Sequence, residues 1–400
     1  MFSRYSRELI KEISVTVERS ALKKVAPYLI RRGYEYPCLI MDEMTEAAAG
    51  EKLAVDLETS GLQPVRCLVE AKGNGDVIAD ESTLIRTLLC VPRESDGLVA
   101  VGAGTIHDIT RLIADRMNLP FISVPTAASV DGFASQGAPI ILDGVKQTVQ
   151  TCAPEAIFAD TDVLQSAPQA MIAAGIGDMV GKYTSLIDWQ ISRLIADEPY
   201  DVEGAARTSR ALERCIQCHQ SIVDRTDAGI EILMKSLIES GKVMMQVGHS
   251  RPASGAEHHL SHYWEMDFLR KGKPQVLHGE KVGVATVLIA GLYRNLSHVD
   301  LLSALSDDDS ISEERKIRLQ TRWHDIQALW KKIPSPGDIA ALLSAVGGPT
   351  RPQDIGIDSD LVFRSLHEAH LLRDRYTGLK LAFDLQLLPE TTADLASVMI

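Results

Sequence analysis

Short apolar runs alternate with helical patterns through the first part of this chain. The runs PCLIMD, PVRCLVE, GLVAVG and PFISVP occupy residues 37–42, 64–70, 97–102 and 120–125. Each has the length of a strand and is bounded by turn residues, and helical patterns lie between them. A strand–helix–strand order of this kind predicts a parallel sheet with right-handed crossovers, which is an α/β fold.

The pattern changes at about residue 163. Two runs that lie close together, 138–144 and 146–152, indicate a hairpin after the fourth strand, and 155–160 supplies one more strand. Residues 168–197 are helical throughout, and helical patterns continue almost to the end. Because 400 residues exceed the usual size of one hydrophobic core, we expect two domains, an α/β domain at 1–162 and an all-α domain at 163–400.

Composition excludes several classes of partner. The formal charge of −13 leaves no excess of Lys and Arg to neutralise phosphates, so we expect no nucleic-acid binding. The longest apolar run, 282–293, is too short to span a bilayer and is typical of a buried helix. The N-terminus has no apolar core of a signal peptide, and the six cysteines are scattered without a disulfide framework. These features predict a cytoplasmic protein.

The string CIQCH at residues 215–219 matches the C-x-x-C-H haem-attachment pattern. Haem of that type is attached to exported proteins in an oxidising compartment, and we recognise no export signal in this sequence. The string also lies inside residues 203–226, which read as one continuous helix. We therefore expect a chance match on a helix rather than a haem carrier.

A glycine-rich turn follows the third strand-like run. The sequence passes through Gly102, Ala103 and Gly104 before a helix begins at about Thr105. Glycine allows close backbone approach to a ligand, and a helix N-terminus attracts phosphate, so the turn is compatible with a Rossmann-like nucleotide site. However, His107 stands where the usual fingerprint has its third small residue, and a tight turn without a ligand would also use glycine.

Two neighbouring segments strengthen the nucleotide hypothesis. Asp42 ends the first strand-like run, where its carboxylate would accept a hydrogen bond from a ribose; capping the next helix is the alternative. The loop PTAASVDGFAS at 125–135 follows the fourth run and is dense in small and hydroxyl residues. Ligands of open α/β sheets lie beyond the carboxyl ends of the strands, where all three segments would meet.

The segment PASGAEHHLSHYWE, residues 252–265, holds three histidines. They are His258, His259 and His262, with Glu257 before them. An autonomous zinc-hydrolase site needs H-E-x-x-H, whereas here the glutamate precedes the pair, so that alternative is disfavoured. On a helix, His262 lies one turn beyond His258 on the same face, while His259 is rotated away and is expected to be structural.

Five motifs in their order along the chain resemble those of sn-glycerol-1-phosphate dehydrogenases, and the similarity is closest to the bacterial branch. The motifs are GAGTIHD, PTAASVDG, GIGDMVGKY, SGAEHHLSH and LHGEKVG. That family belongs to the superfamily of iron-containing alcohol dehydrogenase, glycerol dehydrogenase and dehydroquinate synthase. The resemblance implies a Rossmann-like domain, a helical domain with a divalent metal, and an active site in the cleft between them.

The resemblance also assigns residues. It implies Asp178, His258 and His278 as the metal ligands and catalytic centre, with Asp131, Asp178 and His262 in contact with substrate. The positions implied for NAD(H) or NADP(H) are Asp42, Gly104, Thr105, Ile106, His107, Asp108, Thr126, Ala127, Ala128, Ser129 and Ser135. One carboxylate and two imidazoles leave coordination positions open, which is typical of a catalytic metal site. The glycines beside Asp178 would let its helix approach neighbouring backbone closely.

The implied reaction interconverts dihydroxyacetone phosphate and sn-glycerol 1-phosphate by hydride transfer at C2. The resemblance favours nickel as the metal, then zinc, with iron as a third option, and it implies a small phosphorylated substrate. We also expect a homodimer. Lys182 and Arg251 are candidate phosphate ligands, with surface solvation as the alternative. A glycerol or polyol dehydrogenase, or a dehydroquinate synthase, is the competing function within the superfamily.

Overall fold

The computed structural model describes residues 13–73, 75–301 and 311–397. The chain forms two compact units, which are described separately. Unit 1 contains the described residues up to Ala167 together with Arg225–Gly248. Unit 2 contains Pro168–Asp224 and the described residues from His249 onward.

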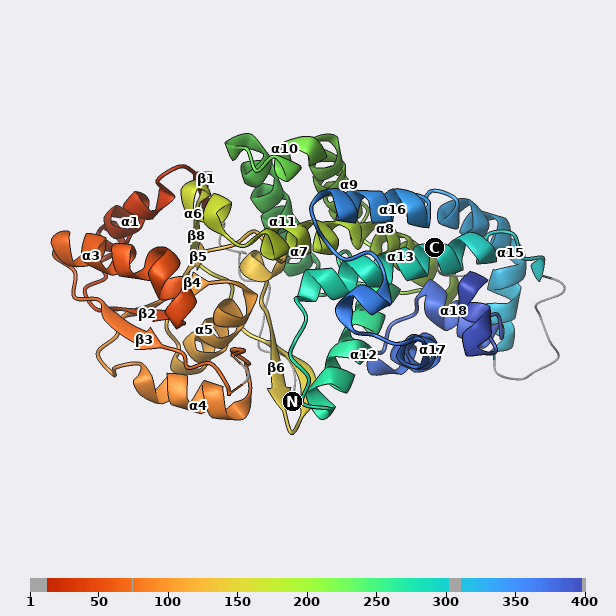
Figure 1. Cartoon of the computed structure of the whole chain (residues 1–400), viewed down its shortest axis with the longest axis horizontal. Coiled ribbons are helices and arrows are strands. Elements are labelled where there is room, and N and C mark those ends of the chain that lie inside the picture. The colour runs from red at the N-terminus through yellow and green to blue at the C-terminus, as the bar shows by residue number, and fades with distance from the viewer. Residues whose placement is uncertain (1–12, 74, 302–310, 398–400) are drawn as a thin grey trace. The chain divides into compact units, whose positions relative to one another are not determined.

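Unit 1 is built on a parallel sheet of six strands in the order β1-β8-β5-β4-β2-β3, shown in Figure 1. The strands are β1 (Ser14–Glu18), β2 (Pro37–Met41), β3 (Val65–Leu68), β4 (Gly97–Gly102), β5 (Phe121–Pro125) and β8 (Ala156–Asp160). The predicted parallel α/β fold is confirmed. β1 was not predicted, because its sequence SVTVE alternates polar and apolar residues at the edge of the sheet.

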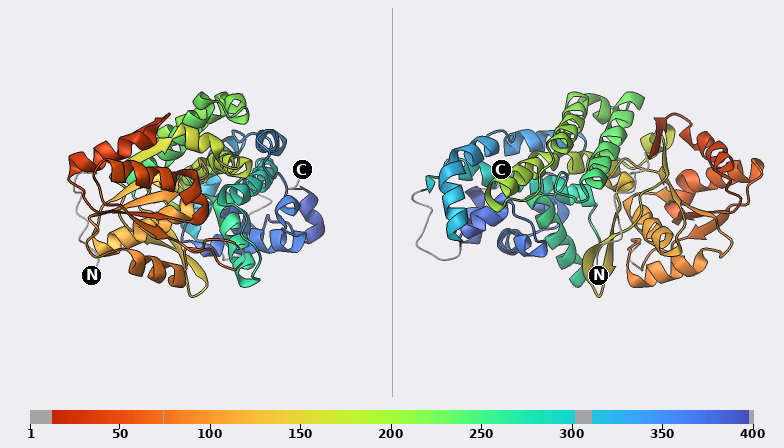
Figure 2. Two further views of the ribbon diagram at one scale, coloured as in Figure 1. Left: turned by 60° about the vertical axis from the view of Figure 1, so that its left-hand side comes forward. Right: turned by 180° about the vertical axis from the view of Figure 1, so that it is seen from behind.

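Helices cover both faces of this sheet, and the two faces can be followed in Figures 1 and 2. Side chains alternate along β2, so Leu39 and Met41 pack with α1 and α3 while Cys38 and Ile40 pack with α4 and α5. The helical segments before and after the strands are η1 (Ala21–Lys24), α1 (Val25–Arg32), α2 (Glu43–Thr45), η2 (Glu46–Gly50), α3 (Glu51–Thr59), α4 (Glu81–Cys90), α5 (Gly104–Met117), η3 (Gly132–Ala134) and α6 (Thr161–Ser166).

The predicted hairpin is present. Strands β6 (Gly137–Leu142) and β7 (Val145–Gln150) pair antiparallel and form a separate two-stranded sheet. Asp143 and Gly144 connect them, with φ of 51° and 72°. Two consecutive positive φ angles fit a type I′ turn, whose twist suits a tight hairpin.

Helix α11 (Asp227–Val247) belongs to unit 1, although it follows helices of unit 2 in the chain. Its small residues allow close packing against the loop after β5. Ser240 Oγ donates to Asp131 Oδ2 at 2.8 Å, and a Cβ on Gly241 would lie 2.5 Å from Asp131 O. The sequence pattern groups this helix with the helical part at 163–400, because amphipathicity does not reveal which core a helix joins.

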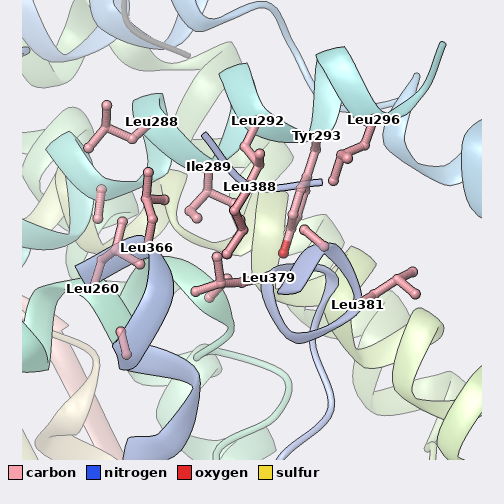
Figure 3. Close-up of a cluster of buried hydrophobic side chains, with 14 of the residues drawn as sticks. Leu260, Leu288, Ile289, Leu292, Tyr293, Leu296, Leu366, Leu379, Leu381 and Leu388 are labelled. Atoms are coloured by element: carbon pink, nitrogen blue, oxygen red, sulfur yellow. The ribbon is translucent and has the colours of Figure 1, made fainter. Parts of the chain in front are cut away.

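Unit 2 is helical. Its elements are α7 (Gln169–Val180), α8 (Lys182–Ala196), α9 (Val202–Gln217), α10 (His219–Val223), α12 (Ala256–Arg270), α13 (His278–Leu296), α15 (Glu313–Trp330), α16 (Pro336–Ala345), η4 (Pro352–Ile355), α17 (Ser359–Glu368), η5 (Ala369–Leu372), α18 (Gly378–Asp384) and η6 (Thr392–Ser397). The apolar run at 282–293 forms the buried middle of α13, as predicted, and its side chains Leu288, Leu292 and Tyr293 lie in the core drawn in Figure 3. Within the described residues, none of the helices has the length and hydropathy needed to cross a bilayer.

The prediction of one continuous helix over 203–226 is wrong. α9 ends at Gln217, Cys218 has non-helical angles of −102° and 15°, and α10 begins at His219. The His219 Nε2 atom lies 2.9 Å from Leu342 O, so the chain bends where this ring meets another segment. Tertiary contact here overrides a helical pattern.

Candidate metal centre and nucleotide-binding edge

Helices α7 and α13 cross at unusually close range in unit 2. A Cβ on Gly177 would lie 2.0 Å from Gly279 O, and a Cβ on Gly279 would lie 1.8 Å from Ala174 O. Only glycine fits at both positions, because any side chain would overlap the backbone of the other helix. Asp178 and His278 are the next residues along each helix, so this contact brings them together.

Asp178, His258 and His278 converge in unit 2. Each offers one ligand atom, and the three atoms lie within 4.8 Å of one another. His258 Nε2 is 3.8 Å from Asp178 Oδ1, and the rings of His258 and His278 have centroids 5.2 Å apart. One carboxylate and two imidazoles suit a divalent transition-metal ion, and a small inward movement would bring all three to bonding distance. The residues therefore form a candidate metal site.

Lys182 is buried against this cluster. Its Nζ donates to Asp178 Oδ1 at 2.7 Å and to Ala253 O at 3.3 Å, and both side chains are fully buried. Burial alone would raise the pKa of Asp178, but the Lys182 ammonium and the two imidazoles outweigh burial and lower it. The carboxylate is therefore ionised and ready to bind a cation.

Glu257, which had no role in the sequence analysis, orients His258. Its Oε1 lies 2.7 Å from His258 Nδ1 and accepts from Gly255 N at 2.6 Å, while Oε2 accepts from Thr184 Oγ1 at 2.6 Å. Burial would raise the pKa of Glu257, but the hydrogen bond and charge of His258 and the hydrogen bonds from Thr184 and Gly255 together outweigh burial and lower the pKa. A carboxylate accepting from Nδ1–H leaves Nε2 unprotonated toward Asp178, which is the tautomer that a metal ligand needs.

His262 lies beside the three candidate ligands. Its ring centroid is 6.2 Å from that of His258 and 6.0 Å from that of His278. Arg373 Nη2 is 3.2 Å from His262 Nδ1. Since a guanidinium only donates, Nδ1 accepts in this contact and the proton of a neutral His262 is on Nε2.

His259 is separated from the cluster, as expected from its rotation on α12. Its side chain is fully buried, and burial followed by the charges of Arg375 and Arg373 lowers its pKa well below the ordinary value. A ring in this environment stays neutral, and it contributes to packing rather than to a metal site.

Two residues considered for phosphate binding have other partners. Lys182 pairs with Asp178, as described above, and Arg251 Nε donates to Glu198 Oε2 at 2.6 Å. Arg373 and Arg375, which follow η5, form no ion pair with an Asp or Glu among the described residues. No local motif marks them in the sequence, so they were missed.

In unit 1, three chain segments meet at the carboxyl edge of the sheet. β4 lies between β2 and β5, with Gly102 opposite Pro125 in the register. The residues after these strands are the predicted cofactor positions Asp42, Gly104 to Asp108 and Thr126 to Ser129. Because β2 and β4 lie at the point where the strand order reverses, this edge is where an open α/β sheet binds its ligand.

The N-terminus of α5 is suited to a phosphate. The helix begins at Gly104, and its N-cap residue Ala103 supplies no side-chain hydrogen bond. A Cβ on Gly102 would lie 2.7 Å from Ile106 Cβ, so glycine is needed where the strand turns into the helix. The N–H groups of the first turn attract an anion, as the glycine-rich sequence indicates.

His107, although predicted at the cofactor, has its side chain inside unit 1. Nδ1 lies 2.9 Å from Ala103 O and Nε2 lies 2.7 Å from Ser123 Oγ. Burial lowers the pKa of His107 to about 3. The ring holds the start of α5 onto β5, so any cofactor contact at this position would come from backbone atoms.

The remaining predicted positions in unit 1 have partners of their own. Asp42 Oδ1 accepts from Thr45 N at 2.8 Å, which is the helix-capping role weighed against ribose binding. Asp131 accepts from Ser240, and Asp108 pairs with buried Arg111 at 3.0 Å. Ser135 Oγ donates to Gly137 O at 3.3 Å.

The C-x-x-C-H string is not arranged for haem. Cys215 is fully buried on α9, and the His219 ring contacts Leu342 O. All six cysteines are free thiols. Covalent haem needs both sulfurs to be accessible, so the match is accidental.

Comparisons with known proteins give the family. A sequence profile described as iron-containing alcohol dehydrogenase matches residues 16–168. Glycerol-1-phosphate dehydrogenase [NAD(P)+] of Geobacillus thermodenitrificans is 47% identical over 366 residues, covering 91% of both chains. The protein of that name from Bacillus subtilis is 44% identical over 372 residues, covering 93% of this chain and 91% of its own.

Structural comparison agrees at the level of fold. The crystal structure of glycerol dehydrogenase from Schizosaccharomyces pombe superposes with a TM-score of 0.67 at 17% identity, covering 97% of this chain and 89% of that one. The two sequence relatives confirm the family expected from the motifs. The chain belongs to the glycerol-1-phosphate dehydrogenase family.

Proposed function

We propose that this chain is an NAD(P)-dependent glycerol-1-phosphate dehydrogenase that interconverts dihydroxyacetone phosphate and sn-glycerol 1-phosphate. The observation that carries the proposal is the convergence of Asp178, His258 and His278 in a chain that is 47% identical to a relative of that name. In the reductive direction C2 of the ketone accepts a hydride and its oxygen accepts a proton. The nicotinamide, when bound, supplies the hydride.

The residues around the candidate metal site divide the remaining work. A divalent metal ion, when bound by Asp178, His258 and His278, polarises the C2 oxygen. Glu257 fixes the tautomer and orientation of His258, and Lys182 fixes the carboxylate of Asp178. His262 presents Nε2–H as a donor for a substrate oxygen, which agrees with its expected role as a substrate ligand.

The cofactor is proposed to lie at the carboxyl edge of the sheet in unit 1. Its pyrophosphate would meet the first turn of α5 from Gly104 to Asp108, and the loop from Thr126 to Ser129 together with Ser135 would line the same side. Asp42 would meet the adenosine ribose, and Asp131 the substrate.

The metal, assembly and compartment are also proposals. We favour nickel, then zinc, then iron, because all three accept one carboxylate and two imidazoles and the bacterial branch of the family favours nickel. We propose a homodimer in the cytoplasm. Six free cysteines without a disulfide are typical of a reducing compartment.

Steady-state kinetics test the function. NADH and NADPH oxidation is measured with dihydroxyacetone phosphate and, separately, with dihydroxyacetone. The protein is chelated, dialysed and reconstituted with nickel, zinc or iron in turn. We expect activity only after a metal is restored, with a strong preference for the phosphorylated ketone. Equal use of both ketones would instead indicate a polyol dehydrogenase, and full activity of the metal-free protein would refute the mechanism.

A further inference from the structure

The segment between η5 and α18 holds two partly buried arginines, Arg373 and Arg375. Within the described part of the chain, neither Arg373 nor Arg375 forms an ion pair with Asp or Glu. Both side chains are only partly exposed to solvent. Paired guanidinium groups removed from water without a counter-ion are costly, so the arrangement suggests a ligand that supplies negative charge.

The two guanidinium groups converge on one hydroxyl. Arg375 Nη2 donates to Ser250 Oγ at 2.9 Å, and Arg373 Nη1 donates to the same atom at 3.4 Å. Arg375 Nη1 also donates to Ser254 O. These contacts hold both arginines against the loop before α12, with N–H groups of each beside the same hydroxyl. Guanidinium N–H groups brought together in this way suit the oxygens of a phosphate.

The electrostatics agree with this geometry. Burial, followed by the nearby charges of Arg373 and Arg251, lowers the pKa of Arg375 to about 9, and the charges of Glu257 and Glu198 only partly offset these effects. Arg251 is itself paired with Glu198. Positive charge therefore remains in excess at Arg373 and Arg375, and a dianion would relieve their mutual repulsion.

The arginines also connect to the candidate metal site through His262. Arg373 Nη2 lies 3.2 Å from His262 Nδ1, and the His262 ring centroid is 6.0 Å from that of His278. We infer that Arg373 and Arg375, with the Ser250 hydroxyl between them, bind the phosphate of the substrate while its C2 oxygen faces the metal ligands. This assignment rests on the proposed function and supplies its phosphate specificity.

A phosphate monoester has a second source in this reaction, the 2′-phosphate of NADP(H). The substrate is favoured here because Arg373 contacts His262, which lies beside His258 and His278 in unit 2. A purely structural role in holding residues 250–254 is a further alternative. The three roles affect different kinetic constants, so one set of variants separates them.

The experiment uses the metal-loaded full chain and its R373Q, R375Q and R375K variants. We expect KM for dihydroxyacetone phosphate to rise by about tenfold to a hundredfold in the Gln variants. This is the effect of losing one or two charge-assisted hydrogen bonds to the phosphate. kcat/KM for dihydroxyacetone, KM for NADPH, metal content and Tm should stay near the wild-type values. R375K should recover part of the affinity, since it keeps the charge but loses the planar fork.

A matched control is R322Q, which removes an arginine of α15 that pairs with Asp325 at 3.3 Å; no kinetic constant should change. Unchanged preference for the phosphorylated ketone in both Gln variants overturns the inference. If only KM for NADPH rises, the arginines bind the cofactor. If kcat/KM falls equally with both ketones and metal is lost, the arginines have a structural role. Either result overturns the inference. Wild-type protein that ignores dihydroxyacetone phosphate would instead refute the proposed function.

Discussion

Replacing Glu257 tests whether metal affinity depends on the group that orients His258. Glu257 accepts three hydrogen bonds, from His258 Nδ1, Gly255 N and Thr184 Oγ1, and is fully buried. In E257Q the amide oxygen would still accept from His258 and Gly255. The new NH₂ would donate to Thr184 Oγ1, whose own proton would turn to Gly181 O at 3.1 Å. E257Q therefore removes the charge and keeps the geometry.

The expected effect follows from this difference. When a metal-bound histidine loses the group that accepts its second N–H, metal binding weakens by about 10-fold to 100-fold, or about 1.4–2.7 kcal/mol. We expect E257Q near the lower value and E257M, which also loses the orientation of His258, near the upper value. The assay is competition with a chelator of known affinity, with metal occupancy measured by mass spectrometry so that activity plays no part in the result.

The control is E314Q, since Glu314 is an exposed residue of α15 paired with Arg318. E314Q should bind metal as the wild-type chain does. If E257M, while retaining the wild-type circular dichroism spectrum, binds metal within twofold of the wild-type affinity, the role given to Glu257 is wrong.

Three other predictions concern Asp178, His107 and Asp42. D178N should abolish metal binding, and it should lower the free energy of unfolding by about 3–5 kcal/mol because it leaves the Lys182 ammonium without its carboxylate. D178N/K182M should recover that stability but still bind no metal. Urea unfolding and metal analysis measure the two effects. The pKa of His107 is about 3 in the folded chain and about 6.5 in the unfolded chain. Below about pH 6.5 the unfolded chain therefore binds a proton that the folded chain does not. The free energy of unfolding then falls by up to about 1.4 kcal/mol for each pH unit. H107Q should show a smaller fall in urea unfolding between pH 7 and about pH 4.5, and an unchanged slope would contradict the assignment. D42N keeps a good helix cap but removes the charge, so KM for NADPH should fall by about tenfold while KM for NADH changes little; the same shift for both cofactors would place the ribose elsewhere.

Local sequence was sufficient to predict most of unit 1. The runs at 37–42, 97–102 and 120–125 are mostly apolar because strands in the middle of a parallel sheet are buried on both faces. β1 escaped prediction because an edge strand needs no such pattern. α11 and the bend at Cys218 depend on which distant segments they touch, and the periodicity of one sequence carries no such information.

The candidate metal centre was predicted by family resemblance and not by spacing. Asp178, His258 and His278 come from three helices, so no short motif unites them. The glycines at 177 and 279 were a visible signal of close helix contact, but their partners were not. Glu257 stands beside a candidate ligand in the sequence, yet its role depends on which way the His258 ring turns. Arg373 and Arg375 become a pair of interest only when the fold brings both beside Ser250 and shows no ion pair to them within the described residues.

Anomalous X-ray diffraction from crystals of the metal-reconstituted protein, recorded at the absorption edge of the metal, tests the central claim most directly. The account predicts one strong peak per chain, bonded to a carboxylate oxygen of Asp178 and to one imidazole nitrogen each of His258 and His278. A peak at any other group of residues, or none in protein that reduces dihydroxyacetone phosphate, would contradict it.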